Sequence, residues 1–394
     1  MQNEKRFLGV HPDVLKLGLV SFLTDVSSEA IFSVFSVFFT TIVGASVALL
    51  GIVEGLADFS ASSLDYIAGW LSDKTGKRKP LAMVGYCFSV LAKMFLVVAS
   101  SVSALATFRV VERLGKSFRG APRDAWLSDV AEKSTRGYSF GVHKALDKAG
   151  AVIGPFVAYF ILASFGQTIY AFRILFVVAA IFAALAVVVL ALVKERPGTV
   201  REKENIFKAW SYLSPGFKAY LIPAGIFALA YFSFSFLLLK AYNVGFAVKD
   251  VVLLYALFNL SFVIVSSSIG KLGDKIGRSY ILMCSYVIYT VMSLGFIFAD
   301  QKWEVIILFV LFGIFYSIDE GQSKAFIADL EKDRRATAIG AYNLITGLVY
   351  FMASVIAGFL WSLQPAYAFE FAALVSFVAM ITFIFSMSKM SSVE

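Results

Sequence analysis

Long apolar segments alternate with short polar ones along the whole chain. Gly, Pro and clusters of charged residues interrupt the apolar pattern at regular intervals, and a membrane-spanning helix needs about 20 predominantly apolar residues. The pattern therefore predicts a polytopic membrane protein of about twelve helices. The expected segments are residues 14–42, 46–71, 80–101, 103–130, 138–165, 169–193, 218–242, 247–270, 279–299, 303–329, 337–362 and 366–388.

One polar stretch divides this series of segments into two equal sets. Residues 194–217 begin with Lys194, Glu195, Arg196 and Pro197, and their Pro, Gly and charge content is typical of a surface connection. The predicted organisation is a first six-helix bundle over residues 1–193, a cytoplasmic linker over residues 194–217 and a second six-helix bundle over residues 218–394.

The composition excludes an ordinary soluble globular protein. Apolar residues make up 59% of the 394 positions and charged residues only 16%, whereas soluble domains contain roughly 45–50% and about 25%. Lys5 and Arg6 precede a long first apolar segment without a small-residue cleavage site, so we expect a retained first helix. The two cysteines, Cys87 and Cys284, lie inside apolar segments and suggest neither a disulfide framework nor a zinc site.

The positive charges lie in alternate connections between the predicted spans. The formal net charge is +8, and the opposite set of connections holds few basic residues beyond Lys249 and Lys302. By the positive-inside rule, both termini and the linker are expected on the cytoplasmic side. The charge therefore indicates membrane topology and no nucleic-acid partner. The basic residues of the cytoplasmic set outside the linker are Lys5, Arg6, Lys74, Lys77, Arg78, Lys79, Lys133, Arg136, Lys271, Lys275, Arg278, Lys332, Arg334 and Arg335.

The two halves share a short motif after their second span. Residues 69–77 read Gly-Trp-Leu-Ser-Asp-Lys-Thr-Gly-Lys, and residues 270–278 read Gly-Lys-Leu-Gly-Asp-Lys-Ile-Gly-Arg. A second pair, residues 125–129 and 325–329, closes the fourth span of each half at nearly the same offset and ends in Asp129 and Asp329. Two repeats at one offset indicate that the halves are related copies of one bundle.

The doubled motif, the six-plus-six layout and the basic linker resemble the major facilitator superfamily over essentially the whole chain. The runs at residues 24–29 and 113–125 are similar to those of a bacterial subgroup described as drug-efflux-like or uncharacterised. The resemblance implies an all-α integral membrane fold of twelve transmembrane helices in two pseudo-symmetric six-helix bundles, with both termini cytoplasmic. It also implies alternating access about a site near the bilayer midplane, in a monomer of the bacterial inner membrane, and neither enzymatic activity nor a cofactor.

The shared motifs predict two charged clusters on the cytoplasmic side. Gly69 and Gly270 open the motifs, and glycine permits a close helix approach or a sharp turn. We expect the charged residues to form latches that help to close the cytoplasmic side; the alternative is solvated loop charges that only obey the positive-inside rule. The expected latches are Asp73 with Lys77 and Asp129, and Asp274 with Arg278 and Asp329.

Ionisable residues inside the predicted spans are numerous, and most belong to the first half. Each costs roughly 2.5 kcal/mol or more to insert, and such residues mark substrate or proton paths. Spacings of three or four residues place them on shared helix faces, where facing stripes of opposite charge also form structural ion pairs, so both roles stay open. The candidates are Asp25, Glu29, Glu54, Asp58, Arg109, Glu112, Arg113, Lys116, His143 and Asp147, with Tyr316, Asp319 and Asn343 in the second half.

The fourth predicted span carries the densest positive charge. Arg109 stands where the superfamily motif has its buried arginine, but the glycine that the motif has four residues later is Arg113 here. This departure makes the site more basic. Lys116, Arg119 and Arg123 approach the cytoplasmic end of the span, where ion pairing or phospholipid contact is expected.

The fifth predicted span carries His143 and Asp147, which are four residues apart. A metal ion could bind two such ligands on one helix face, but one His and one Asp do not make a metal site. We therefore expect a proton relay or a hydrogen-bonded role for this pair, and no metal.

The leading functional interpretation is secondary active transport of a small polar solute, anionic or zwitterionic, because the cations of the fourth span lie at cavity depth. Buried carboxylates beside cations favour proton coupling, with Asp25, Glu29 or Glu54 as the carrier. The alternatives are a multidrug/proton antiporter, a transporter of carboxylate siderophores or metal chelates, and a non-transporting sensor. No G-x-S-x-G, H-E-x-x-H or Walker-type loop is present, so we expect no enzyme. The expected partners are the solute, protons and membrane lipids, with the direction of transport open.

Overall fold

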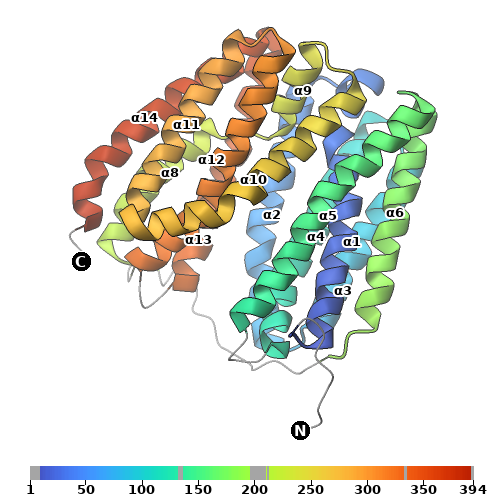
Figure 1. Cartoon of the computed structure of the whole chain (residues 1–394), viewed down its shortest axis with the longest axis horizontal. Helices are drawn as coiled ribbons and strands as arrows, with labels where there is room; N and C mark the ends of the chain where they lie inside the picture. The colour runs from blue at the N-terminus through green and yellow to red at the C-terminus, as the bar shows by residue number, and fades with distance from the viewer. Residues whose placement is uncertain (1–8, 132–135, 196–209, 211–212, 332–334, 392–394) are drawn as a thin grey trace. The chain divides into compact units, whose positions relative to one another are not determined.

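The computed structural model describes residues 9–131, 136–195, 210, 213–331 and 335–391, and these residues fold almost entirely into helices (Figure 1). Every predicted span has a helical counterpart, which confirms the all-helical interpretation. The first six are α1 (Pro12–Val37) with a short π-helical extension η1 (Phe38–Ile42), α2 (Val47–Thr75), α3 (Lys79–Val98), α4 (Val102–Val130), α5 (Arg136–Phe165) and α6 (Ile169–Ala191). The others are α8 (Pro215–Ala230), α9 (Ser235–Asn243), α10 (Val248–Ile276), α11 (Arg278–Phe298), α12 (Lys302–Leu330), α13 (Arg335–Leu363) and α14 (Pro365–Ser391).

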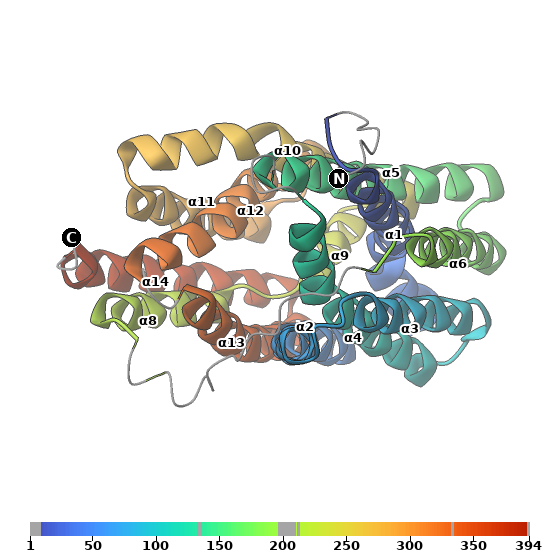
Figure 2. The same cartoon turned by 90° about the horizontal axis from the view of Figure 1, so that it is seen from below.

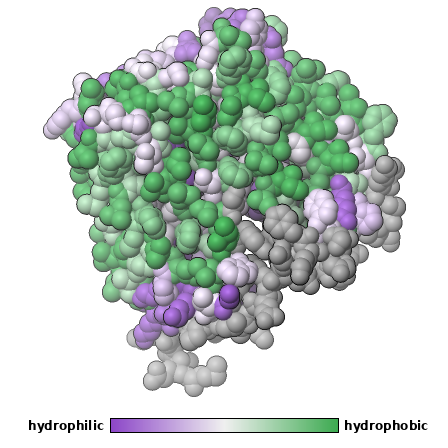
Figure 3. All heavy atoms as spheres, turned by 180° about the vertical axis from the view of Figure 1, so that it is seen from behind, coloured by the Kyte–Doolittle hydropathy of each residue, from purple (hydrophilic) through white to green (hydrophobic). Residues whose placement is uncertain are grey.

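Ten helical stretches of the described residues are long and apolar enough to cross a membrane. Large apolar side chains face outward on these helices; on α6, Val177, Ile181, Leu185 and Val188 follow one another at helical spacing and are 41–59% exposed. Figure 3 shows apolar residues over most of one face, with hydrophilic residues gathered at its upper and lower edges. The exterior is that of an integral membrane protein. α4 and α12 are not among the ten, and α4 carries charged residues along much of its length.

The shared motif of the two halves lies mostly on helices rather than in loops. We predicted that the second and eighth spans end at residues 71 and 270, where the apolar pattern stops, but α2 continues to Thr75 and α10 to Ile276. Gly76 and Gly277 follow with φ of 67° and 99°, a region that residues with a Cβ rarely adopt. The second glycine of each motif therefore makes the turn, and the charged residues before it occupy the last helical turns.

The chain divides into two compact units. Unit 1 comprises residues 1–44, 60–203 and 248–256, and unit 2 comprises residues 45–59, 204–247 and 257–394. Two helices contribute to both units: the first part of α2 packs within unit 2, and the first part of α10 packs within unit 1. Most of the predicted linker, residues 194–217, lies outside the described residues.

In unit 1, α1 packs along α5 and α6, and α3 packs along α4 (Figure 2). Glycines allow both close approaches. A Cβ added at Gly150 of α5 would lie 2.4 Å from the carbonyl oxygen of Phe22, and one added at Gly85 of α3 would lie 2.7 Å from that of Gly115 on α4. Backbones that approach this closely fix the relative positions of the polar side chains that the same helices carry.

In unit 2, α8 packs along α14 and α13, and α11 packs along α12 and α14. The start of α2 packs on α13, because a Cβ added at Gly51 would lie 2.3 Å from the carbonyl oxygen of Ser354. The seventh predicted span, expected as one helix over residues 218–242, is broken: α8 ends at Ala230 and α9 begins at Ser235. Broken spans are tolerated in membrane proteins where side chains satisfy the freed backbone groups.

Candidate functional site

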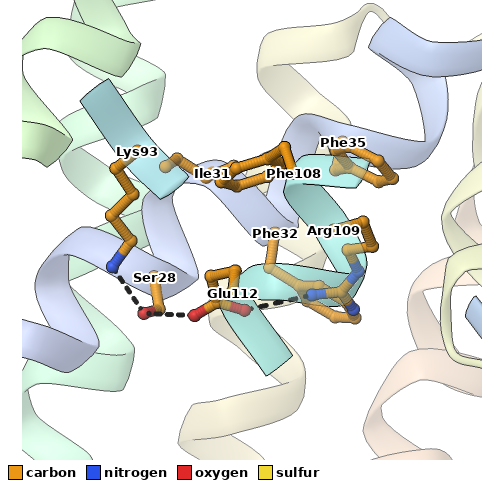
Figure 4. Close-up of a pocket in the computed structure, with 8 residues that line it drawn as sticks. All are labelled: Ser28, Ile31, Phe32, Phe35, Lys93, Phe108, Arg109 and Glu112. Atoms are coloured by element: carbon orange, nitrogen blue, oxygen red, sulfur yellow. Dashed lines mark hydrogen bonds and ion pairs between the residues drawn. The ribbon is translucent and has the colours of Figure 1, made fainter. Parts of the chain in front are cut away.

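A chain of buried polar side chains links α3, α1 and α4 inside unit 1 (Figure 4). The Lys93 Nζ donates to the Ser28 Oγ at 2.9 Å, and the Ser28 Oγ donates to the Glu112 Oε1 at 3.2 Å. The Arg109 Nη1 lies 3.6 Å from the Glu112 Oε2. Lys93 is 0% exposed, and Arg109 and Glu112 are each 4% exposed. Two cations and one carboxylate are therefore held together away from solvent.

These side chains form the polar part of a small pocket, whose free volume of about 10 Å³ is room for about one water molecule. Its remaining walls are apolar and mostly aromatic (Figure 4). Ligand pockets are typically about 300–1,000 Å³ and combine apolar walls with a few placed polar groups. This pocket has that chemistry but is far smaller in this structure. Its lining consists of Ser28, Ile31, Phe32, Phe35, Lys93, Phe108, Arg109 and Glu112.

Phe32 of this pocket also contacts Tyr255, which forms a hydrogen-bonded pair with Glu29. The guanidinium carbons of Arg109 and Arg113 lie 4.5 Å and 5.5 Å from the centroid of its ring, which is a favourable cation–π arrangement. Tyr255 of α10 meets the same ring edge-on with centroids 5.5 Å apart, and its hydroxyl donates to the Glu29 carboxylate. The α1 carboxylate is thus held by a tyrosine, and the two arginines of α4 are positioned against an aromatic ring.

A second network joins α1, α4 and α5 further along α4. The Arg123 Nη1 donates to the Ser21 Oγ at 2.9 Å, and the same hydroxyl lies 3.0 Å from the His143 Nε2. Asp147 lies 3.1 Å from the Lys144 Nζ and 3.9 Å from Arg123. His143 and Asp147 are therefore members of one hydrogen-bonded and ion-paired network. Groups of three or more potential metal ligands do not occur among the described residues.

Asp25 and Lys116 lie between these two networks, and both are half-buried. In the part of the chain that the structure describes, neither makes a hydrogen bond or an ion pair. The sequence singled out both residues, and the structure leaves them near each other without a direct bond.

Glu54 belongs to unit 2 together with Asp58, whereas the other ionisable candidates of the first half belong to unit 1. It is 0% exposed and accepts a hydrogen bond of 3.3 Å from the Ser233 Oγ, at the break between α8 and α9. The Ser354 Oγ accepts a bond of 3.1 Å from the Ser233 backbone N–H. Asp58, one turn along α2, is half-buried. The carboxylate of Glu54 therefore supports the broken span.

The other candidates of unit 2 lie among aromatic rings. Asp319 of α12 accepts a bond of 3.2 Å from the Ser323 Oγ. Tyr316 packs on Phe258 and Phe262 with ring centroids 5.5 Å away in each case. Asn343 lies half-buried on α13, next to a tyrosine that stacks on another ring of the cluster. The wider cluster contains Tyr220, Tyr231, Tyr286, Tyr289, Tyr342 and Tyr350.

The charged residues of the second predicted latch lie together. Arg278 lies 2.9 Å from the Asp274 carboxylate and 3.1 Å from that of Asp329. Gly270 faces open space, with no described atom within 4 Å of an added Cβ, so the close helix approach expected there is absent from this structure.

In the first predicted latch Asp129 pairs with Arg78, while the predicted pairing of Lys77 with Asp73 lies outside the described side chains. Asp129 lies 3.4 Å from the Arg78 Nε, and the Arg78 Nη1 donates to the Ser72 Oγ at 2.7 Å. Lys77 is exposed, whereas Arg78 is 3% exposed. The turn at Gly76 explains the contact of Arg78, because it directs the next residue outward and the following one back toward α2 and α4. Gly69 is buried on α2, and the side chain of Asp73 lies outside the described part of the structure.

Two buried cations were not among the predicted site residues. Lys93 stands alone in the middle of an apolar span, and the rule that flags ionisable residues inside spans applies to it directly. Arg119 was assigned to the cytoplasmic end of the fourth span, but it is 3% exposed and lies over the ring of Tyr86 at 4.8 Å. A stripe of charges on one helix does not show which of its members a neighbouring helix covers.

Two helical units with an apolar exterior and a hydrogen-bonded, charged interior are the architecture of a polytopic membrane transporter. The chain belongs to the major facilitator superfamily, whose family model matches residues 17–266 and 226–392. It is 34% identical over 381 residues to an uncharacterised MFS-type transporter of Methanocaldococcus jannaschii, in an alignment that covers 95% of this chain and 94% of that relative. It is also 23% identical over 320 residues to multidrug resistance protein 1 of Bacillus subtilis, with 78% and 79% covered.

Solved transporters share the fold. The nucleoside transporter NupG, in a mutant form, gives a TM-score of 0.80 at 12% identity, and the match covers 95% of this chain and 99% of that one. A bacterial homologue of the human lysosomal transporter Spinster gives 0.69 at 15% identity, with 96% and 95% covered. At these identities the likeness shows the fold alone.

Proposed function

We propose that this chain is a secondary active transporter that moves a small anionic or zwitterionic solute across the bacterial cytoplasmic membrane by alternating access. The observation that carries this proposal is the pocket of unit 1, whose lining holds Lys93 and Arg109 beside a single carboxylate, Glu112. Buried cations in excess favour a ligand that brings negative charge, because each charge taken from water needs a compensating partner. The aromatic walls suit the organic part of such a solute.

The proposed topology has twelve spans in two pseudo-symmetric bundles, with both termini and the linker in the cytoplasm. α4 spans the membrane in spite of its charges, because those at Arg109, Glu112 and Arg119 are covered by α1 and α3. α12 spans likewise, with Asp319 bonded inside unit 2. The protein acts as a monomer in contact with membrane lipids, and needs no cofactor.

In this mechanism the charged clusters at the motifs act as cytoplasmic latches. Arg278 with Asp274 and Asp329 forms one, and Arg78 with Asp129 forms the other. Protons drive transport through one of the three protonatable carboxylates Asp25, Glu29 and Glu54. Glu29 has a tyrosine hydroxyl as its partner and Glu54 a serine hydroxyl, and such hydroxyls can bond the carboxyl group in either protonation state.

Proton-driven drug export is the second candidate. Two observations favour it: the relative named multidrug resistance protein 1, and the three phenylalanines, Phe32, Phe35 and Phe108, that line the pocket. An apolar cationic drug would use these walls, whereas the buried cations beside them oppose its charge.

Transport into proteoliposomes under an imposed pH gradient tests the proposal. We expect pH-dependent uptake from a panel of labelled monocarboxylates, dicarboxylates and amino acids, and at least a tenfold loss of rate in Lys93→Met and Arg109→Gln. Lys16→Gln is the matched control, because Lys16 lies on α1 with 39% of its side chain exposed and pairs only with Asp13 in the described structure. Movement of ethidium with no movement of any anionic or zwitterionic solute would replace the proposal by the second candidate.

A further inference from the structure

Two hydrogen bonds fix α1 and α4 as antiparallel neighbours. Ser28 bonds Glu112 at 3.2 Å, and Ser21, two turns earlier on α1, bonds Arg123, three turns later on α4. The stretch of α1 between these anchors is about 10 Å long, and that of α4 is about 16 Å long, at 1.5 Å per residue. Asp25 lies midway along the first stretch. Lys116 and Arg119 lie on either side of the middle of the α4 stretch. All three side chains therefore lie at the same height along the two helix axes.

These three charged groups are left without direct partners. Among the described residues, no hydrogen bond or ion pair involves Asp25, Lys116 or Arg119. Arg119 is 3% exposed, and its buried Nη1 has no hydrogen-bond partner. Its guanidinium rests on the Tyr86 ring at 4.8 Å. A buried guanidinium nitrogen without a hydrogen-bond acceptor is costly, and an anion that accepts from it would remove that cost.

The neighbouring charges do not supply that acceptor. Glu112 is engaged by Ser28 and Arg109, and Asp147 of α5 by Lys144 and Arg123. Other ionisable groups on the packed elements have contacts elsewhere: Glu29 with Tyr255, Lys93 with Ser28, Arg113 with Phe32, His143 with Ser21, and Arg173 of α6 with backbone carbonyls at the end of α3. Asp25 interacts electrostatically with Lys116 and Arg119 of α4 and with the carboxylates of Asp147 and Glu29. These two cations and one carboxylate therefore make no hydrogen bond or ion pair with the described residues, and the buried Arg119 Nη1 lacks an acceptor.

We propose that Lys116 and Arg119 form an anion subsite for the carboxylate or phosphate group of the transported solute, and that Asp25 takes up one proton when this anion binds. The inference rests on the proposed function and names the group that the solute presents to unit 1. A bound anion at Lys116 and Arg119 brings negative charge beside the Asp25 carboxylate. A proton on Asp25 removes that repulsion, so one singly charged anion and one proton enter together and the net charge around these three side chains stays unchanged.

Anion binding to the purified full-length protein tests this subsite with inorganic phosphate and acetate as probes. Thermal unfolding followed by tryptophan fluorescence reports binding, and a pH indicator in weakly buffered solution reports proton uptake. For the wild type we expect a rise in melting temperature with one of the probes and about one proton taken up per anion. Arg119→Gln and Lys116→Gln should each weaken the affinity at least tenfold, and Arg119→Lys, which keeps the charge, should weaken it less.

Asp25→Asn separates the two parts of the proposal. It should bind the probe anion without proton uptake, and its affinity should no longer fall as the pH rises. Lys16→Gln, which removes an exposed cation from the same unit, should behave as the wild type. Unchanged affinity in both Arg119→Gln and Lys116→Gln overturns the subsite, and proton uptake that persists in Asp25→Asn overturns the role of Asp25.

Lipid phosphate is the other source of the same chemistry. The binding is therefore measured in nanodiscs of phosphatidylcholine alone and in nanodiscs that also contain phosphatidylglycerol. Equal affinities support a subsite for a soluble anion, whereas a tenfold weaker affinity with phosphatidylglycerol assigns the two cations to lipid and overturns the proposal. If neither probe binds the wild type, while Arg109→Gln still abolishes solute uptake in proteoliposomes, the subsite fails and the proposed function stands.

Discussion

The fourth span of each half, α4 or α12, closes with the same motif, but the two spans have different interiors. Both end at an aspartate that pairs with an arginine next to the shared glycine turn: Asp129 with Arg78, and Asp329 with Arg278. In the part of α4 that precedes Asp129, cations bond to α1 or lie on aromatic rings of α1 and α3. The corresponding part of α12 packs phenylalanine and tyrosine rings against α8, α10 and α11.

The difference shows which parts of a duplicated bundle stay alike and which diverge. The helix ends keep the same charged cluster because it depends on a turn and two or three charges. The interiors differ because α4 holds its described charges in ion pairs and hydroxyl bonds, whereas α12 packs aromatic rings and bonds Asp319 to a serine hydroxyl. Substitutions at matched residues of the two units should therefore have unequal consequences.

The largest effect is expected at Glu112. Glu112→Ala leaves Lys93 and Arg109 buried beside each other without their shared carboxylate, and breaking a buried charge pair costs about 3–5 kcal/mol of unfolding free energy. The matched change in α12 is Glu320→Ala, because the Glu320 Oε2 is buried and has no hydrogen-bond partner among the described residues. Denaturant unfolding of the purified proteins compares them. A loss as large for Glu320→Ala as for Glu112→Ala would contradict the contrast between the two interiors.

The two latches should differ by a smaller amount. Arg78 has 4% of its side chain exposed, so Arg78→Gln loses charged hydrogen bonds that are screened from water, and we expect a cost of about 1.5–3 kcal/mol. Arg278 has 28% of its side chain exposed and its partner Asp329 57%, so Arg278→Gln should cost under about 1 kcal/mol. The same unfolding measurement, repeated at high salt, checks the assignment. Added salt should weaken the wild-type contribution of Arg278 and leave that of Arg78 nearly unchanged.

The helices could be predicted because span length and apolar periodicity are local properties of the chain. The ends of α2 and α10 could not, because the helices run on through polar residues until Gly76 and Gly277 stop them. The break after Ala230 also escaped prediction. No proline or glycine occupies residues 231–234, and the break depends on Glu54 and Ser354, which are distant in sequence.

Most of the candidate site was predictable as a list of residues but not as an arrangement. Ionisable residues inside spans identified Glu112, Arg109 and Asp147, which the structure joins in networks. The bonds themselves involve small hydroxyl residues such as Ser21 and Ser28, whose partners depend on how α1 packs on its neighbours. That Glu54 belongs to unit 2 could not be predicted either. Residue spacing along α2 does not show which part of the helix packs in each unit.

The smallest effect is expected in the tyrosine cluster of unit 2. The Tyr289 hydroxyl donates to the Ala230 carbonyl oxygen at 2.9 Å, at the last residue of α8, so Tyr289→Phe leaves a buried acceptor without this donor. The expected cost is about 1 kcal/mol. Tyr286→Phe is the matched control, because its ring stacks on Phe227 with centroids 4.0 Å apart and its hydroxyl makes no hydrogen bond within the described structure. Equal losses in the two variants would mean that ring packing alone, without the hydroxyl at the break, holds α8 and α9 in place.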